Sequence, residues 1–577
     1  MIRVLLASAV RSNLLLLIIA IVLVIIATVY GQIALNRWNR PFYNALTQRD
    51  FEAFIIQLGV FGRIAGALLI LNVAQRWLNE MMKLKLREGV VQDLVEQWLK
   101  PQHAFRLASA GPIGINPDQR MHEDARHLTE LSSDLGIGLF QASVLLMSFI
   151  AVLWALSGTL AFRIIGHDFA IPGYMVWAAV IYAGSASLLS YWTGRPLIAQ
   201  NAERYAREAA LRFSLMRVNE HISAISLCGG EADEQRRIGL DLRAVLDVMR
   251  SLVSSVTRLT WVTAGYGWFT IVAPIIVAAP MYFAGNLSFG GLMMAVGAFN
   301  QVQSSLRWFV DNFSSIADWR ATLLRVVSFR HAAMATEVLH HGENRIAFVE
   351  GKPGTLALED VEIVSSGGCT KLREGKVEIE AGEHVLIVGE PSSGKTLLFY
   401  ALAGLWPWGA GRIAWPKGER VLHVPRIPYL PPGTLREVLA YPTKVENFDD
   451  KSFTDALVRL GLERLTPMLD TIKPWYRELS ADEQQVVAFS RALLQKPAWV
   501  LVDEALESTY EETRRRVIDV LANDLDRAGV VYIGRAEAHD HFYSRVLHIV
   551  RDPKARTLSR RATATPAKTP SPDLTPF

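Results

Sequence analysis

Residues 389–396 are Gly389-Glu390-Pro391-Ser392-Ser393-Gly394-Lys395-Thr396, and this stretch decides the fold of the second half of the chain. The apolar run EHVLIV at 383–388 predicts a buried strand before it, and LLFYALA at 397–403 predicts a helix after it. A strand, a GxxxxGK[ST] loop and a helix in this order are typical of the loop that cradles nucleotide phosphates. The glycines let backbone N–H groups approach the phosphates at the N-terminus of the helix. We therefore predict that residues 389–396 bind ATP, with Lys395 on the β- and γ-phosphates and Thr396 on Mg²⁺.

A second predicted strand ends in two acidic residues. The run WVLV at 499–502 is followed by Asp503 and Glu504. An acid at the end of a parallel strand beside a phosphate loop can hold Mg²⁺, and the next carboxylate can deprotonate the attacking water. We predict that Asp503 is a magnesium ligand and that Glu504 is the general base.

The composition predicts that this soluble part is joined to a membrane part. The chain has 577 residues, of which 51% are hydrophobic and 20% charged, and its mean hydropathy is +0.20. These values are too apolar for an ordinary soluble protein and too charged for a protein that lies wholly in the membrane. The formal net charge of +4 gives no indication of a nucleic-acid partner. The two cysteines, Cys228 and Cys369, are far apart and indicate neither a disulfide framework nor a zinc site.

Six apolar stretches within residues 1–325 predict membrane-spanning helices. The first is too long for a secretory signal peptide, and no small-residue cleavage site follows it before residue 36. The second is the weakest, because Arg63, Asn72 and Arg76 interrupt it. The six stretches are Leu14–Ile33, Ile64–Trp77 with its flanks, Ile137–Leu160, Gly173–Trp192, Leu259–Phe283 and Gly290–Phe313.

Loop charge predicts the orientation, because loops rich in Lys and Arg stay in the cytoplasm. The segment 194–258 carries many arginines, whereas the loop after the third span holds only Arg163 and the loop after the fifth holds no Lys or Arg. Both termini are therefore predicted to be cytoplasmic. The segments 78–135 and 194–258 also show apolar residues at helical spacing. We expect helices that extend from the membrane into the cytoplasm, with solvated charged linkers as the alternative.

The last predicted span carries polar side chains, namely Asn300, Gln301, Gln303, Arg307, Asp311 and Asn312. Polar groups inside a membrane are costly unless they face a partner or a water-filled cavity. They are therefore candidate pore-lining groups, with hydrogen bonding between helices as the alternative.

Between the two nucleotide motifs, residues 479–485 read LSADEQQ and are followed by a helical run. This segment resembles the signature motif of the ATPases of ABC transporters. In that family the signature serine of one subunit caps the γ-phosphate that the other subunit holds, so that two ATP molecules join a dimer. The resemblance implies this role for Ser480 and implies ATP and Mg²⁺ as the bound cofactors.

The resemblance extends over nearly the whole chain to the SbmA/BacA-like branch, which is related to peroxisomal acyl-CoA half-transporters. It implies an α-helical transmembrane domain of six spans, like that of ABC exporters, fused to an α/β P-loop nucleotide-binding domain. We expect a permease domain at 1–325, a linker at 326–344, the ATP-binding domain at 345–555 and a disordered tail at 556–577. The segments that carry this branch are NRWNRPFYNAL at 36–46, NPDQR at 116–120, EAALRF at 208–213, WFVDNF at 308–313 with WR at 319–320, and GLWPWG at 404–409.

The nucleotide-binding half departs from the family pattern at five places. Arg426 stands where the family has a glutamine, Arg535 stands for the switch histidine, and Asp482 stands for the second glycine of the signature. The SALD loop reads ESTY at 507–510, and no aromatic residue stands at the adenine-stacking position near 365–368. A carboxylate at Asp482 would repel a phosphate unless it is paired. We expect slow or conditional hydrolysis in which Arg426 and Arg535 supply charge to the γ-phosphate, with drift in a poor ATPase as the alternative.

The main prediction is a homodimeric, ATP-dependent transporter in the lipid bilayer of the bacterial inner membrane. Both termini and the ATPase domain are expected in the cytoplasm, and family analogy suggests a small-molecule or peptide substrate, such as a peptide, a cobalamin-like compound or an acyl compound. One rival is a carrier whose degenerate ATPase domain binds ATP only as a regulator. Another is one half of a heterodimer, in which a second chain supplies the missing groups.

Overall fold

The computed structural model describes residues 11–108, 117–157, 159–164, 167–338, 345–365, 368–507, 509–535 and 541–552. Its backbone contacts divide the chain into two compact units, Met1–Thr336 and Glu337–Phe577. The division falls inside the segment 326–344 that is predicted as a linker, where helix α11 continues to Val338. Residues 339–344 and the tail 556–577 lie outside the described residues.

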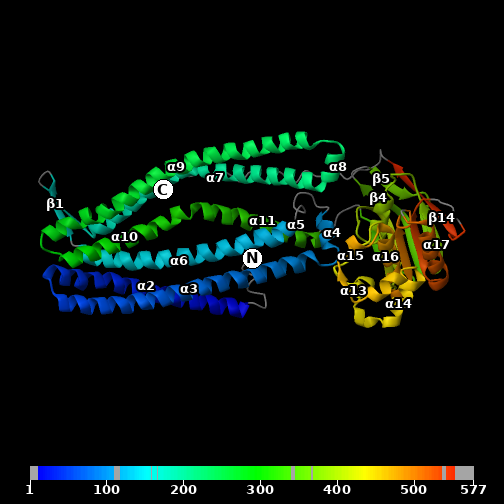
Figure 1. Ribbon diagram of the computed structural model, residues 1–577, viewed down its shortest axis with the longest axis horizontal. Helices are drawn as coiled ribbons and strands as arrows, with labels where there is room; N and C mark the ends of the chain where they lie inside the picture. The colour runs from blue at the N-terminus through cyan, green and yellow to red at the C-terminus, as the bar shows by residue number, and fades with distance from the viewer. Residues whose placement is uncertain are drawn as a thin grey trace. The chain divides into compact units, whose positions relative to one another are not determined.

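The first unit is built from long helices that lie alongside one another (Figure 1). Helix α2 packs against α3, α7 packs against α9, and α10 contacts α2, α6 and α7. The apolar faces of these helices form a buried core that includes Ile25, Leu153 and Phe299. The long helices are α2 (Arg11–Gln48), α3 (Phe51–Trp98), α6 (Ala125–Leu156), α7 (Tyr174–Glu220), α9 (Glu231–Phe283), α10 (Phe289–Asp311) and α11 (Phe313–Val338). The short elements are α4 (His103–Ala108), α5 (Pro117–Gln119), the π-turn η2 (Arg120–Asp124), β1 (Thr159–Ile164), β2 (His167–Pro172) and α8 (Ile222–Leu227).

Five helical segments among the described residues are long and apolar enough to cross a membrane: Ser12–Gln48, Phe51–Trp98, Pro117–Leu156, Tyr174–Glu220 and Glu231–Phe283. They correspond to the first five predicted spans, apart from small differences at the ends. The sixth predicted span corresponds to α10, which has 23 residues. It is long enough to cross, but Asn300, Gln301 and Gln303 lower its hydropathy. The sixth crossing therefore stays a prediction.

Two predicted spans end earlier than their apolar runs suggest. Helix α6 stops at Leu156 rather than Leu160, because Ser157 leaves the helical conformation and its hydroxyl accepts the N–H of Met175 at 3.1 Å. Leu160 lies instead in β1, which pairs antiparallel with β2. Helix α10 stops at Asp311, since the Asn312 side chain donates to the Trp308 carbonyl at 2.9 Å and competes with the helix backbone. The next helix, α11, begins immediately afterwards.

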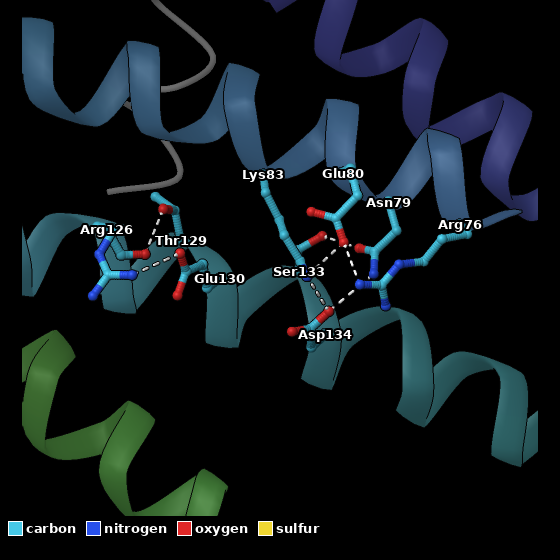
Figure 2. Close-up of polar contacts among 9 residues, drawn as sticks. All are labelled: Arg76, Asn79, Glu80, Lys83, Arg126, Thr129, Glu130, Ser133 and Asp134. Carbon is cyan, nitrogen blue, oxygen red and sulfur yellow. Dashed lines mark hydrogen bonds and ion pairs between the residues drawn. The ribbon is translucent and has the colours of Figure 1, made fainter.

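The segments 78–135 and 194–258 are largely helical, as predicted, and belong to α3, α6, α7 and α9. Polar side chains join α3 to α6 in the region that Figure 2 shows. Asn79 Nδ2 donates to Asp134 Oδ1 at 2.9 Å, and the Ser133 hydroxyl donates to Asn79 Oδ1 at 2.7 Å. Lys83 Nζ lies 2.9 Å from Asp134 and 3.3 Å from Glu80. Lys83 therefore bridges carboxylates of both helices.

Helix α11 is tied to the same helices by further polar contacts. Arg330 Nε lies 2.6 Å from Asp93 of α3, and Arg325 makes two hydrogen bonds of 3.1 Å with Asp124 of η2. Trp319 donates its indole N–H to the Ser132 hydroxyl of α6 at 2.8 Å. These pairs fix α11 against α3, η2 and α6, and the Arg330–Asp93 pair lies in the part of α11 that was predicted to be linker.

The second unit is centred on a large mixed sheet, and Figure 1 labels several of its strands. Neighbouring strands follow the order β3-β8-β4-β5-β14-β7-β13-β12-β9, and β6 pairs with β4. Strands β14, β7, β13, β12 and β9 are parallel, while β4, β5, β6 and β8 form an antiparallel part. The strands are β3 (Ala347–Gly351), β4 (Thr355–Ser365), β5 (Gly368–Leu372), β6 (Lys376–Glu380), β7 (His384–Val388), β8 (Gly409–Pro416), β9 (Val421–Val424), β12 (Trp499–Asp503), β13 (Gly529–Gly534) and β14 (Arg545–Asp552).

The parallel strands β7, β12 and β13 explain where the nucleotide motifs meet. Their side chains are mostly buried on both faces, which suits the apolar runs in the sequence. Because the carboxyl ends of parallel strands lie at one edge of a sheet, the segments that follow these three strands converge there. The helices of the unit are α12 (Lys395–Leu402), α13 (Leu435–Ala440), α14 (Asp450–Arg459), α15 (Trp475–Glu478), α16 (Ala481–Gln495) and α17 (Glu511–Asp519).

The remaining elements of the second unit are short. They are β10 (Gly433–Thr434), which pairs with β11 (Ile472–Lys473), the 3-10 turns η4 (Val445–Asn447) and η5 (Glu463–Met468), and the π-turn η6 (Val520–Asp524). Helices α13, α14 and α16 pack around a core that contains Leu435, Phe453 and Phe489. This core lies beside the signature segment and holds α16 in place.

Candidate nucleotide-binding site

The loop at 389–396 connects β7 to α12 and is held from two other strands. Gly394 caps the N-terminus of α12 in a left-handed conformation with φ of 95°, and a Cβ there would lie 2.3 Å from Thr370 Oγ1. The Thr370 hydroxyl of β5 donates to the Ser393 carbonyl at 2.9 Å, and Arg551 of β14 donates to the Ser392 carbonyl at 2.7 Å. The loop conformation is therefore fixed by glycine at its close approach and by hydrogen bonds to its own carbonyls.

Lys395 and Glu504, the predicted phosphate lysine and general base, form an ion pair. Lys395 Nζ lies 2.6 Å from Glu504 Oε1, and both side chains are largely buried, with 8% and 15% of their surface exposed. Arg426 Nη1 lies 3.6 Å from the other oxygen, Glu504 Oε2. Glu504 itself is left-handed at φ of 48° and donates its N–H to the Ile533 carbonyl at 2.8 Å. Nucleotide phosphates that draw Lys395 would therefore compete directly with Glu504.

Asp503 is the last residue of β12 and is 2% exposed. Burial raises the pKa of Asp503 to about 6, and the neighbouring charge of Glu504 adds to the rise, while a hydrogen bond with the Thr396 side chain opposes it. Its Oδ1 has no hydrogen-bond partner among the described residues. A buried carboxylate oxygen without a partner, next to a hydroxyl, suits a hard cation that prefers oxygen ligands. Thr396 and Asp503 thus fit the predicted Mg²⁺ site.

Ser480 lies at the N-terminus of α16, in a capping box with Glu483. The Ser480 hydroxyl accepts the Glu483 N–H at 3.3 Å, and the Ser480 N–H donates to the Glu483 carboxylate at 3.0 Å. Arg464 also pairs with Glu483. None of the contacts found between described residues joins Ser480 to the loop at 389–396. The structure therefore leaves Ser480 exposed and apart from the phosphate loop of its own chain.

Asp482 is paired within its own domain. Asp482 Oδ1 accepts the backbone N–H of Tyr510 at 2.9 Å, and Oδ2 accepts the Thr513 hydroxyl at 2.8 Å. The carboxylate thus caps the start of α17, where N–H groups lack helical partners. Both carboxylate oxygens of Asp482 thus have a hydrogen-bond donor within this domain, although neither donor carries a charge.

The two arginines of the altered motifs lie beside different carboxylates. Arg426 contacts Glu504, and its carbonyl accepts a hydrogen bond from the buried Gln485 of α16. Arg535, the first residue after β13, has its Nε 3.4 Å from Glu507 Oε2. The structure therefore brings Lys395, Arg426 and Glu504 into direct contact, and it adds Glu507, a residue that the motif analysis noted only as a departure. The sequence could have indicated Glu507 through its position three residues after the predicted general base, Glu504.

A cavity in the first unit includes one of the polar residues predicted to line a pore. It has a volume of about 530 Å³ and is bordered by α7, α9, α10 and α11. Asp311 lines it together with Tyr191, Arg195 and Thr263. Gly184 also lines it, and a Cβ at that position would meet nothing within 4 Å. Asp311 is at the same time bound by Arg307 Nε of its own helix at 3.0 Å.

Comparison with known proteins assigns the two parts of the chain. Residues 1–283 match the family described as ABC transporter transmembrane region 2, and residues 372–507 match the family described as ABC transporter. A solved structure, a bacterial Atm1-family ABC exporter with ATP bound, shares the fold with a TM-score of 0.70 at 16% identity, over 95% of this chain and 94% of that chain. The chain is thus a fused ABC half-transporter, in which a helical transmembrane region is joined to an ABC ATPase domain.

Three relatives place this half-transporter more closely. The inner membrane ABC transporter ATP-binding protein YddA of Escherichia coli is 26% identical, over 90% of this chain and 91% of the relative. ABC transporter D family member 2 of Arabidopsis thaliana, a chloroplastic protein, is 27% identical over 92% and 82%. The human lysosomal cobalamin transporter ABCD4 is 22% identical over 88% and 87%. The chain is therefore related to the D family of ABC transporters.

Proposed function

We propose that this chain forms a homodimer in the bacterial inner membrane and uses ATP hydrolysis to move a small or amphipathic substrate across it. The observation that carries the ATPase part is the buried Lys395–Glu504 pair of 2.6 Å beside the phosphate loop. A peptide, a cobalamin-like compound or an acyl compound is the substrate class we favour. The names of the Escherichia coli and human relatives support the membrane and the cobalamin-like class. The motifs at 36–46 and 308–313 support the SbmA/BacA-like branch.

Different residues around the phosphate loop bind the phosphates, bind Mg²⁺ and accept the proton in this proposal. Residues 389–396 cradle the phosphates with Lys395, and Thr396 and Asp503 hold Mg²⁺, which neutralises phosphate charge when bound. Glu504 accepts the proton of the attacking water. Lys395 and Arg426 compete with water for the oxygens of Glu504, so these contacts support slow or conditional hydrolysis. Arg426 and Arg535 supply positive charge to the γ-phosphate.

The exposed Ser480 supports a dimer. It stands at the N-terminus of α16, where backbone N–H groups favour an anion, and it has no contact with the phosphate loop of its own chain among the described residues. In the proposed dimer Ser480 acts on the nucleotide held by the second chain. ABC half-transporters typically dimerise, and a second copy of this chain is the partner we propose.

The cavity between α7, α9, α10 and α11 is the proposed place of the substrate. Its volume of about 530 Å³ lies within the range of small-molecule sites. Both termini and the ATPase domain lie in the cytoplasm in this proposal, because the arginines of 194–258 favour that side. Replacing Gly184 by leucine fills the open space at that wall and should abolish transport while the ATP affinity is retained.

The deciding experiment measures Mg-ATP hydrolysis and ATP binding on the same samples of the purified chain in lipid. Glu504→Gln should abolish hydrolysis and keep binding. The matched control is Glu446→Gln, the same change at an exposed residue of η4, which should hydrolyse ATP like the unaltered chain. Binding without hydrolysis in the unaltered chain would favour the regulatory role, and copurification of a different second chain would favour the heterodimer.

A further inference from the structure

Glu507 and Arg535 join the segments that follow two neighbouring strands. Arg535 follows β13, and its Nε lies 3.4 Å from Glu507 Oε2. Glu507 follows β12 and donates its N–H to the Glu504 carbonyl at 3.3 Å. The Glu507 side chain is 18% exposed, whereas that of Arg535 is 63% exposed. The mostly buried carboxylate of Glu507 thus pairs with the mostly exposed guanidinium of Arg535, at the same edge of the sheet as Glu504.

Arg535 lies within ion-pair distance of Glu507 in a closely packed setting. A Cβ at Gly534 would lie 2.4 Å from the Tyr532 ring and 3.0 Å from Glu507 Oε1, so a side chain there would clash with Tyr532 and crowd the carboxylate. Glu507 Oε1 has no hydrogen-bond partner among the described residues. Burial raises the pKa of Glu507, the charge of Glu504 raises it further, and Lys395 and Arg535 oppose the rise. The ionised carboxylate is therefore favoured by two cations, Lys395 and Arg535, of which Arg535 is within ion-pair distance.

The two residues also belong together in the family pattern. Arg535 stands where the family has its switch histidine, and Glu507 stands at the serine that opens the SALD loop. Either change alone would place one uncompensated charge near Glu504. Breaking a partly buried ion pair from one side leaves the remaining charge without its partner, which costs more than the pair contributes. The two departures compensate each other.

We propose that Glu507 is the positioning residue of Arg535, so that the ion pair sets where the guanidinium stands relative to the γ-phosphate. This inference rests on the proposed role of the site in ATP hydrolysis. It predicts that Glu507→Ser and Arg535→His, made singly, each lower kcat at least about tenfold. The double variant carries the two uncharged family residues and should recover to within about threefold of the unaltered chain.

The test is this double-mutant cycle in the full chain in lipid, with kcat and KM for ATP measured for all four proteins. The KM for ATP should stay nearly constant, because ATP binding uses Lys395 and the loop at 389–396. A pair with a purely structural role would instead lower the unfolding temperature and leave kcat unchanged. Arg527→His, the same change at an exposed arginine, is the matched control. Losses that multiply in the double variant, or singles with unchanged kcat, overturn the proposal.

Added variants and a binding measurement test the proposal if a variant fails to fold or if the unaltered chain hydrolyses no ATP. If Glu507→Ser or Arg535→His fails to fold, Glu507→Gln and Arg535→Lys take their places: the glutamine should lower kcat, and the lysine, which keeps the charge, should retain more activity than histidine. If the unaltered chain hydrolyses no ATP, the proposed ATPase function fails. The pair is then tested through the ratio of the affinities for AMP-PNP and ADP in the same cycle. An absence of coupling in that ratio overturns the proposal independently.

Discussion

Replacing Asp482 by glycine, the residue of the family signature, removes a cap from α17. The carboxylate accepts the Tyr510 N–H at 2.9 Å and the Thr513 hydroxyl at 2.8 Å, and both bonds are lost. A hydrogen bond to a charged group contributes about 1.5–3 kcal/mol, and loss of a helix cap costs about 1 kcal/mol. Because Asp482 is only half-buried, water can replace part of the lost bonding, and we expect a loss of about 1–2 kcal/mol in the free energy of unfolding.

Thermal unfolding of the solubilised full chain measures this loss. For a unit of this size the midpoint should fall by about 2–8 °C. Asp482→Asn keeps one acceptor oxygen and should lower the midpoint less than Asp482→Gly does, and Glu446→Gln should leave it unchanged. An unchanged midpoint in Asp482→Gly would refute the capping role, as would Asp482→Asn unfolding as early as the glycine variant.

Gly394→Ala should weaken ATP binding at least about tenfold in an equilibrium titration, because Gly394 has φ of 95° and a Cβ would lie 2.3 Å from Thr370 Oγ1; unchanged affinity would contradict the loop geometry. Lys83→Asp and Asp134→Lys should each lower the unfolding midpoint, and the double swap should regain part of the loss, since the two residues pair at 2.9 Å; no recovery would count against the pair. Although burial opposes it, the capping box and a neighbouring arginine lower the pKa of Glu483. Its stabilisation is therefore present above its unfolded-state pKa of about 4.3 and is lost as the pH falls through the lower folded-state value. Glu483→Gln should unfold earlier than the unaltered chain at pH 7, this difference should shrink as the pH falls through the folded-state value, and equal midpoints at pH 7 would exclude this contribution.

The nucleotide motifs could be predicted because their signals are local. The strand, the glycine turn and the helix start around Lys395 occupy one short stretch, and the strand before Asp503 is a plain apolar run. The convergence of Lys395, Thr396, Asp503 and Glu504 then follows from parallel strand order, which the fold confirms.

The contacts of the altered residues could not be predicted, because their partners are distant in sequence. Asp482 finds its partners at Tyr510 and Thr513, and Arg535 finds Glu507 across neighbouring strands. Apolar composition also says little about where a helix stops. The run that includes Leu160 continues past α6 because strands and spanning helices draw on the same apolar residues.

Side chains of helix α16 form hydrogen bonds with three other parts of the nucleotide-binding domain. Asp482, in its first turn, accepts a hydrogen bond from the Tyr510 N–H at the start of α17. Gln485, one turn later, donates to the carbonyl of Arg426. The buried Arg491 donates to the carbonyls of Val438 at 3.0 Å and Tyr429 at 2.9 Å. A displacement imposed at Ser480 would therefore act on a single helix that contacts Arg426 through Gln485 and the start of α17 through Asp482. A second chain that docks at this end of α16 would thus be linked to Glu504 through Gln485 and Arg426.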